Sequence, residues 1–147
     1  MVIPETVNGF KVTKIADKAF YNNKTITSLD VGDNVTSIGH KAFANCTKLV
    51  SVDLGKSVKS LGNYAFYKCI KLSDINMDAV KTIGKQAFNK CVALAEVDFS
   101  DELASIGSNA FTGVTFKDTD GKELDKTPEN LAGKVFKGSK SVLTLAA

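Results

Sequence analysis

One stretch of sequence decides the fold: residues 35–49 read VTSIGHKAFANCTKL. Its Ala-Phe pair occurs five times, at successive intervals of 23, 23, 22 and 23 residues, with the phenylalanine at Phe20, Phe43, Phe66, Phe88 and Phe111. An apolar residue lies five positions before each phenylalanine, and in the last four units a glycine follows that residue. Such self-similarity at a fixed period is typical of a solenoid, in which each unit stacks on the next.

Other columns of residues keep the same register. Three residues after the phenylalanine, the middle units carry Cys46, Cys69 and Cys91, and apolar residues recur six, nine and eleven positions after it. The interval of 22 residues reflects one residue missing from a turn, where residues 54–58 correspond to residues 77–80. Agreement over this many columns does not arise by chance, so the chain contains about five equivalent units.

The pattern inside one unit predicts its shape. Residues 49–54 (LVSVDL) alternate between apolar and polar at their end, as a strand with one buried face does. Residues 58–61 read as a second short extended piece, and residues 62–69 have apolar side chains at helical spacing, which predicts one or two helical turns. Parallel strands need crossover connections, and these are nearly always right-handed. We therefore predict an α/β right-handed solenoid with a parallel sheet on one face, and short helical turns and second short strands on the others.

Residues 35–49 resemble the BspA-like, type 5 leucine-rich repeat of bacterial and protist surface proteins, and residues 3–15 resemble the start of such arrays. The resemblance covers roughly residues 3–114. It implies a leucine-rich-repeat solenoid that is secreted or attached to the cell surface and binds host or partner proteins. The family has no shared catalytic residues, so the resemblance implies that the chain is not an enzyme.

The repeat divides the chain into three parts. We predict an N-terminal cap leading into the repeats over 1–14, a solenoid of about five units of 22–23 residues over 15–114, and a C-terminal hairpin or cap segment over 115–147. Asp120-Gly121 is a strong turn signal, which predicts a hairpin over 114–124, and 135–136 and 142–145 are predicted short strands. Gly121 falls at position four from Asp118, not at the sixth position that an EF-hand loop requires, which favours a turn over a calcium site. The alternative for this tail is the start of a linker to a further domain.

Composition excludes several classes of function. All 19 basic residues are lysine, against 16 acidic residues, which gives a net charge of +3. The absence of arginine and the small net charge argue against nucleic-acid binding. No apolar run approaches 18 residues, so no membrane insertion is expected. Residues 1–4 do not resemble a signal peptide, and we expect an extracellular or cell-surface location as part of a longer exported chain.

The three cysteines have three interpretations. Their column also accepts Asn23 and Val114 and lies on the apolar side of the unit, which favours reduced thiols packed in the core. One disulfide between neighbouring units is an alternative, because stacked strands lie within the Cα separation of a disulfide. A metal site is the third, although zinc sites usually show close Cys-x-x-Cys pairs.

His40 is the only histidine, and it shares a column with Asp17, Asn63, Lys85 and Ser108. The mixture of polar residues in this column predicts a solvated side chain. With no second histidine for a nucleophile–histidine pair and no phosphate-binding loop, we expect no catalytic residue, no metal and no cofactor.

Outward positions of the main strand form the candidate binding surface. Two neighbouring columns contribute five acids and no lysine among eight residues: Ser28, Asp30, Ser51, Asp53, Asp74, Asn76, Glu96 and Asp98. Lysines gather instead along the predicted helical flank and just before the strand. One interpretation is an ordinary solvated face that is kept polar against aggregation. The other is a docking face for a basic or hydroxyl-rich partner.

We therefore predict a protein-binding, adhesion-type module of a secreted or cell-surface protein, which binds a protein partner such as a host or matrix protein through the sheet face. The alternative is a structural spacer or assembly segment of a larger surface protein, without a ligand of its own. For the oligomeric state we expect a monomer or weak end-to-end self-association.

Overall fold

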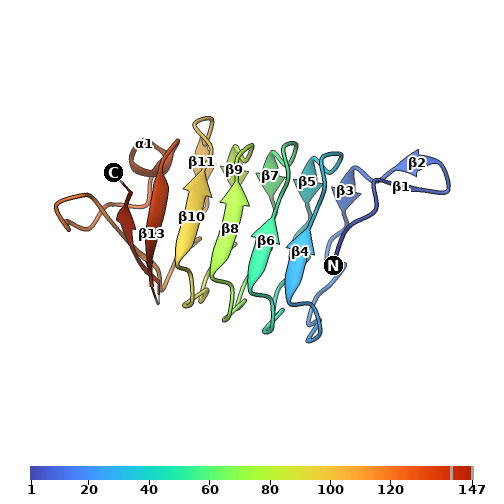
Figure 1. The fold of residues 1–147 in the computed structure, drawn as a ribbon, viewed down its shortest axis with the longest axis horizontal. Coiled ribbons are helices and arrows are strands. Elements are labelled where there is room, and N and C mark those ends of the chain that lie inside the picture. The colour runs from blue at the N-terminus through green and yellow to red at the C-terminus, as the bar shows by residue number, and fades with distance from the viewer. Residues whose placement is uncertain (140, 147) are drawn as a thin grey trace.

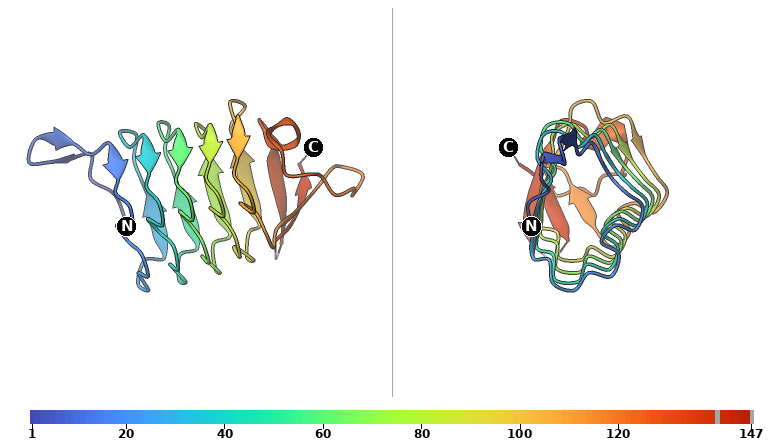
Figure 2. Two further views of the ribbon diagram at one scale, coloured as in Figure 1. Left: turned by 180° about the vertical axis from the view of Figure 1, so that it is seen from behind. Right: turned by 90° about the vertical axis from the view of Figure 1, so that its right-hand side faces the viewer.

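A computed structural model describes residues 1–139 and 141–146. The chain coils through a stack of similar turns, so that strands of successive units lie side by side (Figure 1) and the units superimpose when seen along the stack (Figure 2). Within the described residues the only helix is α1 (Pro128–Leu131), a single turn in the tail. No helix in this part of the chain is long and apolar enough to cross a bilayer.

The main sheet has seven strands, of which four come from successive units. These four pair in parallel and in register, so that Ser28, Ser51, Asp74 and Glu96 lie in one row. Their bounds are β4 (Ser28–Asp30), β6 (Ser51–Asp53), β8 (Asp74–Met77) and β10 (Glu96–Phe99). Each strand alternates between exposed or half-buried and buried residues, which confirms the predicted one-sided burial.

A second, five-stranded sheet runs along another face of the coil and consists of the predicted second extended pieces. It is parallel throughout: β3 (Lys14–Ile15), β5 (Ser37–Ile38), β7 (Ser60–Leu61), β9 (Thr82–Ile83) and β11 (Ser105–Ile106). The solenoid of parallel-sheet turns is therefore confirmed, and the right-handedness of the coil stays a prediction.

The five phenylalanines of the repeat form one continuous stack in the core. Neighbouring rings lie 5.0–5.4 Å apart between centroids and within 6–8° of parallel. Phe43, Phe66 and Phe88 are fully buried at equivalent positions, as the repeat predicts. Each ring covers the face of the next, so no unit can bury its apolar edge without a neighbour.

The predicted helical turns are not confirmed. The segment from Gly39 to Cys46 is a run of tight turns closed by bonds such as Ala42 N–H to the Gly39 carbonyl at 3.3 Å. Lys41 and Asn45 have left-handed backbones, with φ of 56° and 59°, which no right-handed helix accommodates. The equivalent residues of the other units are also left-handed: Lys18, Asn22, Tyr64, Lys68, Gln86, Lys90, Asn109 and Gly113.

Bonds to the neighbouring unit stabilise this strained backbone. In each of the first four units, three amides two residues apart donate to carbonyls of the next unit, as Phe43 N–H does to the Ala65 carbonyl at 2.9 Å. A left-handed residue costs about 1–2 kcal/mol, which hydrogen bonds buried between units offset. We call this pattern the amide ladder.

Both ends of the stack depart from the repeat. At the N-terminus, Val2 bridges to Asp30, and the antiparallel hairpin β1 (Thr6–Val7) and β2 (Phe10–Lys11) projects from the stack (Figure 1). At the C-terminus, three tail strands extend the main sheet beyond β10: β13 (Val135–Ser139), β14 (Val142–Leu145) and β12 (Thr115–Lys117).

The tail contributes its own apolar residues to the core. Phe116, Leu131, Phe136 and Leu143 are fully buried, and Phe99, Phe116 and Phe136 meet edge to face at 5.0–6.0 Å. The predicted turn at Asp118–Gly121 is present, with Lys117 bridged antiparallel to Glu123. The predicted boundaries between the three parts of the chain stay a prediction.

The glycine column sets how closely units approach. A Cβ on Gly62 would lie 2.7 Å from the Gly39 carbonyl carbon and 2.7 Å from the His40 nitrogen, and Gly84 and Gly107 face the unit before them in the same way. The first unit has Ala16 at this position, where no repeat unit precedes it. The exception in the sequence therefore marks the place where the steric requirement ends.

We predict that Gly62→Ala lowers the free energy of unfolding by about 2–3 kcal/mol or more, because the backbone it meets cannot move without separating two units. Urea denaturation measures this change. Ala16→Gly, the reverse substitution in the same column, changes stability by about 1 kcal/mol or less, the cost of glycine flexibility alone. Equal losses in the two variants would contradict the steric explanation.

Candidate binding surface

The eight predicted face residues lie together, in two rows across β4, β6, β8 and β10. Register places Asp30, Asp53, Asn76 and Asp98 in one row and Ser28, Ser51, Asp74 and Glu96 in the other. All eight side chains lie on the side of the sheet opposite the core, exposed or half-buried. Parallel strands are about 4.7–4.9 Å apart, so carboxylates in a row are near neighbours.

Three residues of the row that begins at Asp30 stabilise turns, which the sequence did not predict. The side-chain oxygens of Asp30, Asp53 and Asn76 accept hydrogen bonds of 2.9–3.1 Å from the backbone amide two residues later. Aspartate and asparagine commonly close turns in this way, and here they close the turn that leaves each strand. The occurrence of both aspartate and asparagine in this column was the signal that could have revealed this. The turn needs only a side-chain oxygen as acceptor, and both residues have one.

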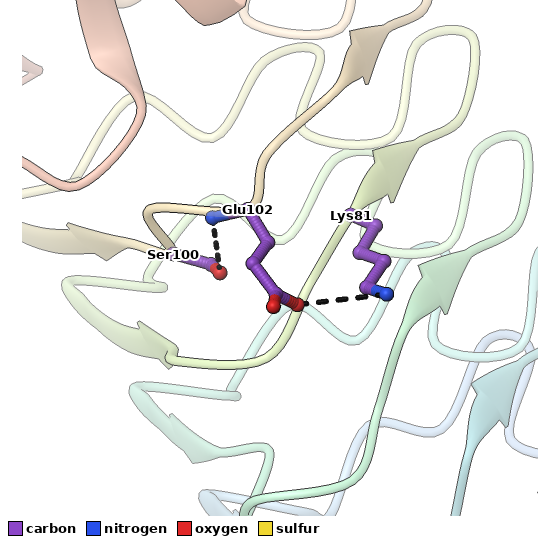
Figure 3. Close-up of polar contacts among 3 residues, drawn as sticks. All are labelled: Lys81, Ser100 and Glu102. Atoms are coloured by element: carbon purple, nitrogen blue, oxygen red, sulfur yellow. Dashed lines mark hydrogen bonds and ion pairs between the residues drawn. The ribbon is translucent and has the colours of Figure 1, made fainter.

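The fourth unit breaks this pattern at Asp98. In that turn the Ser100 hydroxyl accepts from the Glu102 amide at 3.0 Å, as Figure 3 shows, and Glu102 forms an exposed ion pair with Lys81 at 3.5 Å. The Ser100 carbonyl accepts from Gly133 of the tail. Among the described residues, Asp98 Oδ1 is buried without a hydrogen-bond partner.

Partial burial and neighbouring like charges perturb two of the face acids. Partial burial raises the pKa of Asp74, and the charges of Glu96 and Asp53 raise it further. Partial burial also raises the pKa of Asp98, together with Glu96, Asp78 and Asp74. Both carboxylates are therefore less stable as anions on this face than in water.

One lysine contacts the acidic face at its edge, and others lie on a different flank of the solenoid. Lys137 of β13 pairs with Glu96 at 3.2 Å, and the antiparallel register of β10 with β13 brings the two together. The predicted strand at residues 135–136 is present as part of β13, but the sequence did not predict that it pairs with β10. On the flank of tight turns, the ammonium groups of Lys41 and Lys68 lie 5.5 and 5.3 Å from the ring centroids of Tyr64 and Tyr67.

The cysteines are free, buried thiols, which agrees with the first of the three interpretations. Each donates a hydrogen bond to the phenylalanine carbonyl of the preceding unit, as Cys69 Sγ does to the Phe43 carbonyl at 3.1 Å. Burial raises the pKa of all three thiols, that of Cys91 to about 12. No metal-ligand cluster occurs within the described part of the chain.

His40 is exposed, as predicted, but its ring also has a backbone contact. Nδ1 accepts from the Asn63 amide at 2.8 Å. Asp17 and Asn63 do the same through their side chains for His40 and Lys85 in the next units. The column is a ladder of side-chain caps between units.

These features define the class of protein: a leucine-rich-repeat solenoid, whose units share in-register strands, a glycine contact and a phenylalanine stack. The sequence matches the BspA type leucine-rich repeat region in six copies over residues 13–142, so the chain belongs to this family. The matched range continues past residue 114, into the tail whose strands extend the main sheet.

Solved structures agree with this assignment. A leucine-rich repeat protein of T. pallidum is 30% identical with a TM-score of 0.75, over 80% of this chain and 56% of that one. A leucine-rich cell surface protein from Faecalibacterium prausnitzii is 32% identical with a TM-score of 0.60, over 80% of this chain and 37% of that one. The chain thus spans about half of the first protein and about a third of the second. A search of curated proteins found no match.

We predict that Asp98→Asn raises the free energy of unfolding at pH 7 by a few tenths of a kcal/mol. A raised pKa means that the folded state holds the Asp98 proton more tightly than the unfolded state. Stability therefore falls as the pH rises from 3.8 through the folded pKa, and removal of the charge prevents this loss. Urea denaturation as a function of pH tests this prediction. The advantage must vanish near pH 3, and Asp120→Asn in the tail turn must show none.

We also predict that the thiols of the folded protein do not react with a disulfide reagent such as dithiobisnitrobenzoate at about pH 8, because the thiolate is the reactive form and burial disfavours it. In guanidinium chloride all three react within the mixing time. Ile70→Cys, which places a thiol at a position that is 45% exposed, must react rapidly in the folded protein. Rapid reaction of the wild type would show that the stack opens readily.

Proposed function

We propose that the chain is a protein-binding module of a secreted or cell-surface protein and that it docks a basic protein segment on the acidic face of its main sheet. One observation carries the proposal: register stacking brings five carboxylates, on four strands, onto one face. The turn bonds of Asp30 and Asp53 hold two of these carboxylates in place, so little side-chain freedom is lost on binding.

Charge is the property this face offers to a partner. Partial burial raises the pKa of Asp74 and Asp98, and the charges of neighbouring acids raise it further; lysines of a partner would offset that like-charge contribution. Binding would then combine many weak contacts over neighbouring units with electrostatic steering of association. The cell-surface relative from F. prausnitzii supports a surface location for this chain.

A structural role without a ligand is the second candidate, and the stack itself favours it. Identical interfaces between units build a rigid rod, which is what a spacer in a longer surface protein requires. A spacer would show no saturable binding through the sheet face.

We predict that Asp53→Asn with Asp74→Asn weakens binding about fivefold to tenfold to any protein of a matrix-protein panel that the wild type binds saturably, and makes that binding less dependent on salt. Surface plasmon resonance at two salt concentrations measures both effects. Asparagine keeps the turn bond at residue 53, as Asn76 shows in its own unit.

Asp120→Asn with Glu123→Gln removes the same charge from the tail and serves as the matched control, expected to bind like the wild type. If the face variant keeps the affinity and salt dependence of the wild type, the acidic face is not the site. If the wild type binds none of the panel, the spacer role is favoured.

A further inference from the structure

The last unit leaves the amide ladder open. In the four units before it, every donor has an acceptor in the next unit at 2.7–3.0 Å, such as Gln86 N–H to Ser108 and Phe88 N–H to Ala110. The equivalent donors of the last unit are the amides of Asn109, Phe111 and Gly113. Among the described residues these three amides have no hydrogen-bond partner.

The second sheet ends at the same place. The carbonyls of Lys81 and Ile83 accept from Ala104 and Gly107 of the last unit. Their equivalents, the carbonyls of Ala104 and Ile106 on the outer side of β11, accept no bond within the described residues. The main sheet, in contrast, continues through β13. The end of the stack is therefore covered on the main-sheet face and uncovered at β11 and at the turns that follow it, residues 107–113. We call this uncovered end the step.

A cavity and a lysine side chain lie at this step. A cavity of about 330 Å3 is lined by residues 106–112 and by Lys126 of the tail. Lys126 Nζ donates to the Phe111 carbonyl at 2.9 Å, the position that a thiol of the following unit occupies where Cys69 meets Phe43. Partial burial lowers the pKa of Lys126 against the opposing attraction of the Glu123 carboxylate, and the ammonium keeps further N–H donors for an anion.

We propose that this step binds an acidic segment of a partner protein, which adds a strand to β11, continues along the last turns with its carbonyls on the amides of Asn109, Phe111 and Gly113, and pairs a carboxylate with Lys126. Strand addition to an exposed edge is a general mode of peptide recognition. Within the described part of the chain, three donors and two acceptors without partners, together with the Lys126 ammonium, define the complementary ligand. This site is separate from the acidic face and does not depend on the function proposed for it.

A second copy of this chain does not fit the step. The segment that lies on Gly107 must have glycine at the contact, because a Cβ there meets backbone, as Gly84 and Gly107 show at their own contacts. The first unit of another copy presents Ala16 at that position, and the tail strands that continue the main sheet occupy the space beyond β10. Head-to-tail stacking of copies is therefore blocked at both partners.

The probe that tests the proposal is a synthetic peptide copying residues 104–114 with Val114→Asp. It repeats the backbone pattern that pairs with the fourth unit, with glycine at the contact, and it brings a carboxylate to Lys126. The control peptide copies the same residues unchanged. Titration of 15N-labelled protein with each peptide is followed by NMR up to about 5 mM, the range of weak segment binding.

The amides of Asn109, Phe111 and Gly113 are expected to shift saturably, while those of Gln86, Phe88 and Lys90, already bonded, do not. The aspartate peptide is expected to bind about fivefold more tightly than the control, and Lys126→Gln is expected to abolish this difference, whereas Lys122→Gln in the same tail preserves it. The absence of shifts at 5 mM, shifts spread equally over the inner amides, or equal affinity of the two peptides for the wild type would overturn the proposal. The peptide comparison needs no folded variant.

Discussion

The glycine contact between successive units is the constraint on which the structure depends. Gly39, Gly62, Gly84 and Gly107 let the backbone of each unit approach the one before it to a distance that no Cβ permits. At that separation the phenylalanine rings stack 5.0–5.4 Å apart, and a buried thiol reaches the carbonyl of the preceding unit. It also allows the amide ladder to close at 2.7–3.0 Å. A wider spacing at one contact would weaken all of these together, so stability rests on interfaces between units rather than on any unit alone.

Periodicity revealed the columns because each column meets the same environment in every unit. The buried phenylalanines, the one-sided strands and the second strands followed from it directly. The tight turns did not, because Lys41 or Tyr64 in a left-handed conformation has no signature in its residue type, unlike glycine. The apolar spacing of residues 62–69 imitates a helix, and only bonds to the neighbouring units, which no local pattern encodes, select the other conformation.

Alternation likewise placed the eight residues of the acidic face but not their tasks. The oxygens of Asp30, Asp53 and Asn76 are occupied by turn amides, so aspartate and asparagine are equivalent for the fold and differ only in charge. Where Ser100 takes over the turn, Asp98 loses that role and remains as a crowded carboxylate. Asparagine at every position of this row would satisfy the hydrogen bonds that the turns require. The excess of aspartate is therefore the part of this face that folding does not explain.

Every unit of a stack with identical interfaces can accept a further unit, so the residues at the two ends must differ from those of the repeat. At the first unit the methyl group of Ala16 replaces the glycine, and Val2 bridges to the edge of β4. At the last unit the tail seals the core with Phe116 and Phe136 and continues the main sheet, but it leaves the ladder uncovered. The uncovered amides lie beside the partly buried ammonium of Lys126, and each hydrogen bond from them to a partner segment would contribute about 0.5–1.5 kcal/mol relative to water. Since Lys126 already replaces the thiol of a further unit, one more segment with a carboxylate would complete the set of contacts that every inner unit has.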